Sequence, residues 1–468
     1  MATVGPSSSS TKEMLAEMVK AGTDVFRINS SHGNHELFQR VIDDIRALNQ
    51  ENGTNVAILM DLQGPKLRIG VVENDRVVLH EDAEVIFTTE ECIGTDERLF
   101  ITYKEFPKDV AIGDFILLDD GKLKLKVIDT NRKNEVIAQV IYGGVLTSKK
   151  GVNLPNTKIS LPSITEKDKA DLEFALLNNV EWIGLSFVRS AKDIINLKSI
   201  INYHKKKSRV VAKIEKPEAV KVIDHIIEEA DAIMVARGDL GVEMPIEELP
   251  LIQKMIVKKS IKAAKPVIIA TQMMESMITN SSPTRAEVND VANAVLDGAD
   301  AVMLSAETSV GKYPIEVVQY MCKIVSTAER EESIYNRENP PVFQKTKSFI
   351  SDSICYNACK MAQQAHAKAI VAMTHSGFTA YKLASHRPNA DIYIFTDNAS
   401  LLTKLSLVWG VRGFYYDRYV STDETIAEIK EFLKDNNLAK PDDIIINLAS
   451  IPMNEKGMAN MVKLSFVS

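Results

Sequence analysis

Short apolar runs alternate with amphipathic helical stretches over much of the chain. Between residues 180 and 330 these runs recur at roughly 20–35 residues, which is the length of a βα unit. Earlier segments fit the same pattern, and together they give eight predicted strands, the number in a closed (β/α)8 TIM barrel. The predicted strands are Ala2–Val4, Asp24–Ile28, Asn55–Asp61, Trp182–Phe187, Val210–Ile214, Ala232–Ala236, Pro266–Thr271 and Ala301–Ser305.

From residue 67 to 162 the runs become short and alternating, and helical periodicity is absent. Leu117–Lys126, with Asp-Asp-Gly near its centre, predicts a β-hairpin. We therefore expect a small all-β domain over residues 67–162, inserted after the third strand of a barrel formed by residues 1–66 and 163–335. A domain hinged at the rim of a barrel is well placed to act as a lid.

After Asn339-Pro-Pro341 the pattern changes again, and four apolar runs alternate with helical stretches. This predicts a smaller C-terminal α/β domain with an open sheet over residues 340–468. Its predicted strands are Ala369–Thr374, Asp391–Thr396, Gly413–Tyr416 and Asp443–Leu448. Near the other end of the chain, Ser10 followed by Glu13 predicts a capping box at the first helix.

Composition narrows the function classes. The net charge of −7 argues against general nucleic-acid binding and requires a local positive site for any anionic substrate. No apolar run approaches the roughly 18 residues of a membrane span, and no secretory signal pattern is present, which predicts a cytoplasmic protein. Four scattered cysteines fit a reducing compartment, and Cys355 and Cys359 are expected to be thiols in a helix core.

Polar residues cluster where the predicted barrel strands end, which is where barrel enzymes build their active sites. Lys213 and Glu215 are two residues apart on one strand, so their side chains point to the same side. Asp239 follows the next strand. Two carboxylates beside one lysine suit a divalent metal that holds an anionic substrate. The other polar strand ends are Asn29, Asp61, Ser186, Thr271 and Ser305.

Each of these residues also has a structural explanation when it is taken alone. Lys213 could pair with Glu215 to stabilise the barrel, and Asp239 could cap a helix. Thr271 could be an ordinary strand-end hydroxyl, and Arg27 and His32 could pair with surface carboxylates. The functional interpretation depends on all of them ending successive strands. The sequence has no Walker-type glycine loop and no dinucleotide fingerprint, so side-chain cations and metal must hold any phosphates.

In order and spacing, the motifs resemble those of the pyruvate kinase family over essentially the whole chain. The matching stretches are Thr3–Pro6, Arg27–Gly33, Asp61–Pro65, Ser148–Pro155, Ala212–Glu215, Ala236–Gly241, Ala270–Met277 and Met303–Thr308. The resemblance implies phosphoryl transfer from phosphoenolpyruvate to ADP, giving pyruvate and ATP, in a cytoplasmic homotetramer.

The resemblance also implies roles for individual residues. Glu215 and Asp239 match the ligands of Mg2+ (or Mn2+), and Lys213 matches the lysine that neutralises the moving phosphoryl group. Thr271 and the backbone at Gly238 match the substrate carboxylate and enolate region, and Arg27 matches a phosphate-binding arginine. Asn29, His32, Arg68 and Lys150 match positions that face the nucleotide phosphates or their cation. Ser305 and Glu307 match a polar group linked to proton delivery to the enolate.

The monovalent-cation site of the family departs from its pattern here. The resemblance places this site at Asn29, Ser31, Asp61 and the following residue, which is Leu62 and offers only a carbonyl. Family members that need K+ carry glutamate where this chain has Lys66. The Lys66 ammonium can supply the same positive charge, so we expect that K+ is not required.

The effector site also departs from the family pattern. The loop with Thr374, Ser376 and Thr379 keeps its hydroxyls, but Phe378 stands where arginine is common. The stretch 451–457 lacks the tryptophan and arginine associated with fructose 1,6-bisphosphate. We therefore expect weak or no activation by that bisphosphate, with a monophosphate or a nucleotide as the alternative ligand of these hydroxyls.

Two other functions remain compatible with parts of the sequence. A metal-dependent lyase or aldolase that acts on pyruvate or phosphoenolpyruvate would share the Glu–Asp pair but would need no nucleotide, and Arg68 and Lys150 favour the kinase. A catalytically silent regulatory homologue is a different class, and the joint presence of Lys213, Glu215, Asp239 and Thr271 argues against it.

Overall fold

The computed structural model describes residues 1–155, 157–343, 346–418, 421–451 and 459–467. Its largest sheet is parallel and has eight strands in the order β1-β2-β3-β12-β13-β14-β15-β16. An isolated parallel bridge joins Ala2 to Leu304 and closes the barrel. The predicted strands are confirmed as β1 (Ala2–Thr3), β2 (Val25–Asn29), β3 (Ala57–Asp61), β12 (Trp182–Leu185), β13 (Arg209–Ile214), β14 (Ala232–Ala236), β15 (Val267–Ala270) and β16 (Ala301–Met303).

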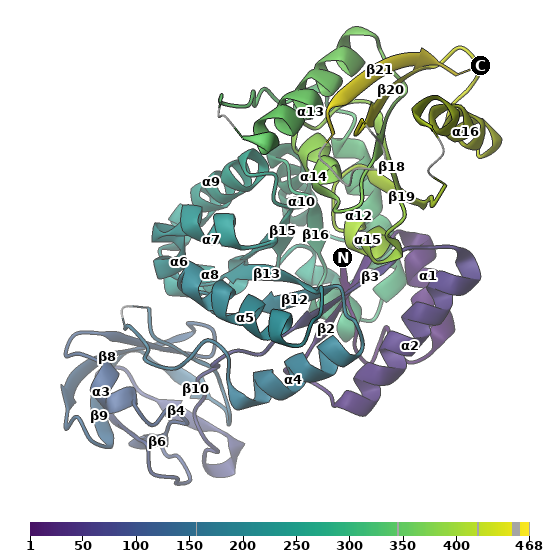
Figure 1. Ribbon diagram of the computed structural model, residues 1–468. Coiled ribbons are helices and arrows are strands. Elements are labelled where there is room, and N and C mark those ends of the chain that lie inside the picture. Colours follow the sequence, from purple (N-terminus) through teal and green to yellow (C-terminus); the bar gives the residue numbers. More distant parts are fainter. Residues whose placement is uncertain (156, 344–345, 419–420, 452–458, 468) are drawn as a thin grey trace.

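Helices surround the barrel, and their buried apolar faces pack on the outside of the strands (Figure 1). The first of them begins one residue later than the sequence suggested, because Thr11 and not Ser10 is the N-cap and accepts a hydrogen bond from the Met14 amide. The barrel helices are α1 (Lys12–Ala21), α2 (His35–Asn52), α4 (Glu166–Leu177), α5 (Ala191–Tyr203), α6 (Pro217–Lys221), α7 (Ile223–Glu229), α8 (Arg237–Glu243), α9 (Leu249–Lys262), α10 (Arg285–Asp297), α11 (Ala306–Ser309) and α12 (Pro314–Ala328), with 3-10 turns at Ile246–Glu248, Glu275–Ile278 and Glu332–Ile334.

The segment between β3 and β12 forms a separate β-rich body with its own apolar core, which projects from the barrel in Figure 1. The predicted hairpin is confirmed, since β7 and β8 pair antiparallel with Leu118 opposite Leu123. We call this body the lid; its exact boundaries stay a prediction. Its elements are β4 (Val77–Leu79), β5 (Glu84–Thr88), β6 (Arg98–Phe100), α3 (Phe106–Asp109), β7 (Phe115–Leu118), β8 (Leu123–Thr130), β9 (Glu135–Tyr142), β10 (Gly144–Leu146) and β11 (Val152–Asn153), with a 3-10 turn at Glu73–Asp75.

The C-terminal part forms a five-stranded open sheet in the order β19-β18-β17-β20-β21. Its last strand runs antiparallel to β20 and was not expected from the sequence. Cys355 and Cys359 are buried free thiols on α13, as predicted. The elements are α13 (Lys347–Gln364), β17 (Ala369–Met373), α14 (Phe378–Ser385), β18 (Asp391–Thr396), α15 (Ala399–Leu405), β19 (Val411–Tyr415), α16 (Thr422–Asp435), β20 (Ile444–Ala449) and β21 (Met461–Phe466).

The register of the barrel brings the polar strand ends to one rim. Asn29 is opposite Asp61 in the β2–β3 pair, and Ala236 is opposite Ala270 in the β14–β15 pair. Residues that follow these positions therefore share the rim from which the lid projects. Over the described residues, no helix is long and apolar enough to cross a membrane.

Candidate active site

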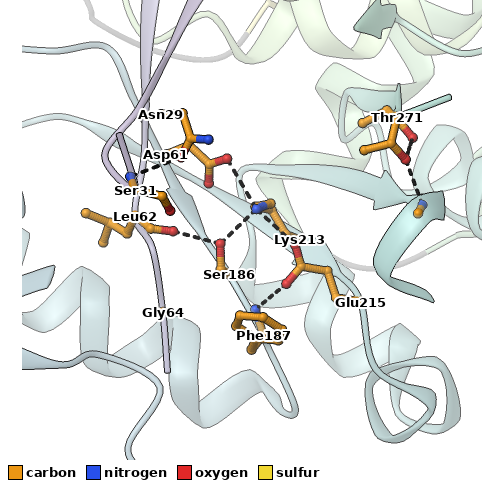
Figure 2. Close-up of polar contacts among 12 residues, drawn as sticks. Asn29, Ser31, Asp61, Leu62, Gly64, Ser186, Phe187, Lys213, Glu215 and Thr271 are labelled. Atoms are coloured by element: carbon orange, nitrogen blue, oxygen red, sulfur yellow. Dashed lines mark hydrogen bonds and ion pairs between the residues drawn. The ribbon is translucent and has the colours of Figure 1, made fainter. Parts of the chain in front are cut away.

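Lys213 lies at the centre of a buried polar cluster on this rim (Figure 2). Its Nζ is 2.9 Å from Glu215 Oε1 and 3.2 Å from Asp61 Oδ2. Arg27 Nη2 lies 2.6 Å from the same Asp61 oxygen. Two cations therefore share one carboxylate, and the sequence prediction that Lys213 and Glu215 face the same side is confirmed.

Each charge in this cluster depends on its neighbours. Burial opposes protonation of Lys213, but the carboxylates of Asp61 and Glu215 outweigh burial and raise the pKa of the lysine. Burial would also raise the pKa of Asp61, but Lys213 and Arg27 hold that pKa below its ordinary value. Lys213 is therefore a permanent ammonium at neutral pH, which is the state that attracts an anionic substrate.

Glu215 and Asp239 together suit a divalent metal ion. Burial raises the pKa of Glu215, and the nearby charge of Asp239 raises it further. Within the described residues, the Asp239 side chain accepts no hydrogen bond, and it lines a cavity between lid and barrel together with Lys66 and Asp120. Two close carboxylates, one of them without a donor, form an oxygen donor set that fits a hard cation.

Thr271 occupies a strained position directly after β15. Its φ is +69° and that of Gln272 is +53°, a region that β-branched residues rarely adopt. The Gly238 amide donates a hydrogen bond of 2.7 Å to Thr271 Oγ1, so the structure brings these two predicted residues together (Figure 2 shows Thr271).

Ser305 is the N-cap of α11, which follows β16, and Glu307 lies in that helix. Glu307 is buried and accepts hydrogen bonds from the amides of Ser305, at 2.6 Å, and Met274, at 3.2 Å. The Ser305 hydroxyl is buried and has no hydrogen-bond partner among the described residues. Glu307 thus anchors the loop that carries Thr271, and the hydroxyl of Ser305 is left available.

The residues predicted to face a nucleotide lie at the junction of barrel and lid. Burial and the cations Arg68, Lys66 and Arg27 lower the pKa of His32, so these side chains form one positive region. On the lid, Lys150 Nζ is 2.7 Å from Asp119 Oδ1. Arg68 donates a hydrogen bond of 2.9 Å to the Lys149 carbonyl. An overall acidic chain thus carries a local positive region at this junction.

The positions predicted for a monovalent cation are adjacent, but most of their oxygens are already used. Asn29 Oδ1 accepts the Ser31 amide at 3.1 Å, and the Leu62 carbonyl accepts Ser186 Oγ at 2.7 Å. Asp61 Oδ1 is buried and has no partner among the described residues. Asp61 Oδ1 is therefore left for a cation or a water molecule.

The predicted effector loop joins β17 to α14. Thr374 Oγ1 accepts the Gly377 amide at 3.0 Å, and Thr379 is buried. The Ser376 carbonyl accepts a hydrogen bond of 3.2 Å from Arg209, at the start of β13. The loop therefore lies at the opposite end of β13 from Lys213. In the stretch 451–457, which was compared with the fructose 1,6-bisphosphate pattern, residues 452–457 lie outside the described residues.

Sequence reasoning assigned no role to three groups that the structure places in the site. Ser186 Oγ accepts a hydrogen bond of 2.8 Å from Lys213 Nζ, and the Phe187 amide donates one of 2.7 Å to Glu215 Oε2. Arg237 Nη2 donates to the Thr271 carbonyl at 2.8 Å. Ser186 could be recognised in the sequence as a strand-end hydroxyl. The contacts of the Phe187 amide and of Arg237 could not be predicted, because they depend on the tertiary structure.

A closed parallel barrel with a buried lysine between carboxylates at its rim, and with a β-rich lid that projects from that rim, defines a barrel enzyme for an anionic substrate. Family models described as "Pyruvate kinase, barrel domain" and "Pyruvate kinase, alpha/beta domain" match residues 1–318 and 352–465. The chain belongs to the pyruvate kinase family and is a phosphotransferase.

Full-length relatives agree with this assignment. A pyruvate kinase of Geobacillus stearothermophilus is 41% identical over 100% of this chain and 79% of that protein. One of Corynebacterium efficiens is 42% identical over 98% of this chain and 95% of that protein. The crystal structure of a pyruvate kinase from Cryptosporidium parvum matches with a TM-score of 0.93 and 32% identity, covering 100% of this chain and 95% of that chain.

Proposed function

We propose that Lys213 is the cation that neutralises the phosphoryl group as it passes from phosphoenolpyruvate to ADP, giving pyruvate and ATP in the last step of glycolysis. The observation that carries this proposal is the fixed ammonium of Lys213 between Asp61 and Glu215. Phosphoryl transfer needs positioning and charge neutralisation more than covalent chemistry. A preorganised ammonium at the rim supplies both.

Glu215 and Asp239 are the proposed ligands of Mg2+ or Mn2+. Mg2+ is usually held by one or two carboxylates together with substrate phosphates. The bound ion would withdraw negative charge from the phosphoryl oxygens. The place of Asp239 in the cavity lining and the raised pKa of Glu215 support this donor set.

Substrate contacts are proposed for the residues around Thr271. Thr271 and the Gly238 amide would hold the substrate carboxylate and enolate, and Arg27 would bind the phosphate. Arg27 is fixed by Asp61 and by Thr3 Oγ1 at 3.1 Å, which supports a preorganised role. Ser305, whose hydroxyl lacks a partner among the described residues, would deliver a proton to the enolate with Glu307 orienting its backbone.

The nucleotide phosphates are proposed to lie between barrel and lid. Asn29 and His32 would face them from the barrel, and Arg68 and Lys150 from the lid. The lowered pKa of His32 supports this role, because it reports several cations close together. A lyase or aldolase would not need this region, which favours the kinase.

K+ is proposed to be dispensable. Lys66 is exposed at the cavity and adds positive charge near His32. A fixed ammonium can take over the electrostatic contribution of a monovalent cation. Asn29 Oδ1 and the Leu62 carbonyl already accept hydrogen bonds from protein groups, which supports the same proposal.

The C-terminal loop with Thr374, Ser376 and Thr379 is proposed as the effector site, with weak or no response to fructose 1,6-bisphosphate. The assembly is proposed to be a cytoplasmic homotetramer. A titration with fructose 1,6-bisphosphate and with phosphorylated monosaccharides tests the first proposal. Strong activation by micromolar bisphosphate would refute it.

The decisive experiment is a lactate dehydrogenase-coupled assay in tetramethylammonium buffer with Mg2+, with and without ADP and with and without KCl. Pyruvate formation from phosphoenolpyruvate that requires ADP supports the kinase, whereas formation without ADP would indicate hydrolysis of the phosphate ester and would refute the kinase. A large gain in rate on adding KCl would refute independence of K+. Absence of any pyruvate formation would favour a silent homologue.

A further inference from the structure

Arg237 is a buried cation to which the chemistry above gives no role. It is the first residue of α8, directly after β14, and only 9% of its side chain is exposed. Its Nη1 lies 2.7 Å from Asp290 Oδ1 on α10. Its Nη2 donates to the carbonyls of Thr271 at 2.8 Å and Gln272 at 3.3 Å. One guanidinium thus joins α10 to the loop that follows β15.

The two carbonyls that Arg237 binds belong to the two strained residues of that loop. Thr271 and Gln272 both have positive φ, at +69° and +53°. Neither is glycine, and Thr271 is β-branched, so this backbone is unfavourable in isolation. Such conformations persist only where surrounding contacts hold them. Arg237 supplies those contacts at both residues.

The conformation of this turn decides where the Thr271 hydroxyl points. That hydroxyl accepts the Gly238 amide at 2.7 Å and donates to the Ala270 carbonyl at 2.5 Å, and Gly238 follows Arg237 in the chain. Beyond the turn, the Met274 amide is bonded to Glu307. The loop is therefore held at both ends, by Arg237 at residues 271–272 and by Glu307 at residue 274.

We propose that Arg237 is a positioning residue, which holds the Thr271–Gln272 turn in its left-handed conformation and thereby aims the Thr271 hydroxyl at the substrate site. Asp290 fixes the orientation of the guanidinium. This inference rests on the proposed role of Thr271 in binding phosphoenolpyruvate. Lysine cannot replace Arg237, because four acceptors in different directions, the Met273 sulfur at 2.8 Å among them, need the planar fork of donors that only a guanidinium presents.

Steady-state kinetics of Arg237→Met, Arg237→Lys and Asp290→Asn test the proposal. We expect kcat/KM for phosphoenolpyruvate to fall about 100-fold in Arg237→Met, because a small misplacement of a binding group has that effect. The KM for ADP should change less than about twofold, since the nucleotide groups come from other elements. Arg237→Lys should lose about 10-fold or more, and Asp290→Asn less, because the amide still accepts a hydrogen bond.

Two double variants separate positioning from general stability. Gln272→Gly removes the backbone strain at one residue of the turn, so it should recover part of the loss in Arg237→Met. Thr271→Ala combined with Arg237→Met should lose little more than Thr271→Ala alone, because Arg237 acts through Thr271. Lys254→Met is the matched control, since it breaks another ion pair to α10, with Asp297, away from the loop.

Three outcomes would overturn the proposal. The losses of Arg237→Met and Thr271→Ala could add in the double variant, the KM values for phosphoenolpyruvate and ADP could change equally, or Gln272→Gly could fail to restore activity to Arg237→Met. If Arg237→Met does not fold, the same kinetic comparison of phosphoenolpyruvate with ADP is made on Arg237→Lys and Asp290→Asn. If the wild-type chain forms no pyruvate, the proposed function fails separately. Calorimetric measurement of phosphoenolpyruvate binding would then test the inference. We expect weaker binding in Arg237→Lys and a partial recovery of the affinity when Gln272→Gly is added.

Discussion

Lys216 and Glu243 form a buried ion pair, with Lys216 Nζ 2.6 Å from Glu243 Oε1. The same oxygen accepts a hydrogen bond of 2.9 Å from Asn153 Nδ2, on lid strand β11. Lys216 follows β13 and Glu243 ends α8, so two barrel elements present one charged acceptor to the lid. This contact fastens the lid to the rim that carries Lys213 and Asp239.

Asn153→Ala should weaken lid closure and raise the KM for ADP. The lost hydrogen bond goes to a charged acceptor in a buried place, so we expect a rise of about 5- to 20-fold. A coupled assay with varied ADP measures the change. Asn134→Ala is the control, because Asn134 bonds Glu90 within the lid and does not touch the barrel. An unchanged KM for ADP in Asn153→Ala would mean that this contact does not hold the lid closed.

The barrel was predictable because a parallel strand buried on both faces leaves a clear trace, a short apolar run with polar residues at its end. Lys213 and Glu215 could be placed together because they share a strand. The contact from Asn153 to Glu243 could not, because it joins residues from two bodies that only tertiary structure brings together. The pair of Arg237 and Asp290 was missed because α8 and α10 are far apart in sequence and only the folded barrel brings them together.

Two local errors have other physical causes. Val462–Phe466 alternates between apolar and polar residues, but so short a run does not specify a strand alone, and β21 forms because β20 offers an edge to pair with. The N-cap of α1 was misplaced by one position because Ser10 and Thr11 carry the same hydroxyl chemistry. Only the backbone conformation at Thr11 decides between them.

Lys213→Met should abolish phosphoryl transfer while the chain still binds Mg2+. It removes a preorganised positive charge but no metal ligand, and we expect kcat to fall by at least about 1000-fold. The coupled assay measures transfer, and Mn2+ binding followed by electron paramagnetic resonance measures the metal site. Lys198→Met is a suitable control, since Lys198 pairs with Asp231 outside the cluster. Retained activity in Lys213→Met would refute the role given to this lysine.

Lys66→Glu should create a requirement for K+. The substitution replaces a positive charge near His32 with a negative one, and a monovalent cation would be needed to restore the local charge. In tetramethylammonium buffer we expect the variant to lose at least about 10-fold in kcat and to regain most of it with KCl. The wild-type rate should change little. A variant that is equally active without K+ would show that Lys66 has no part in this requirement.

Lys404 is buried on α15, and burial, with help from Arg209, lowers its pKa to about 8. Below pH 8 the native state must bury an ammonium, which destabilises it. Between pH 8 and the unfolded value of 10.5 the native state releases its proton first, so stability rises with pH in this window. At pH 7, Lys404→Met should therefore stabilise the fold by about 1–2 kcal/mol, after allowance for solvent screening.

Urea unfolding followed by tryptophan fluorescence checks this expectation at pH 7 and pH 10. The chain has two tryptophans; Trp182 lies under Arg209, and Trp409 follows α15 by a few residues. The advantage of Lys404→Met should shrink at the higher pH. Lys368→Met is the control, because Lys368 is half-exposed and its pair with Asp391 should contribute less than about 1 kcal/mol. A destabilised Lys404→Met at pH 7 would mean that the ammonium has a favourable partner in the native state.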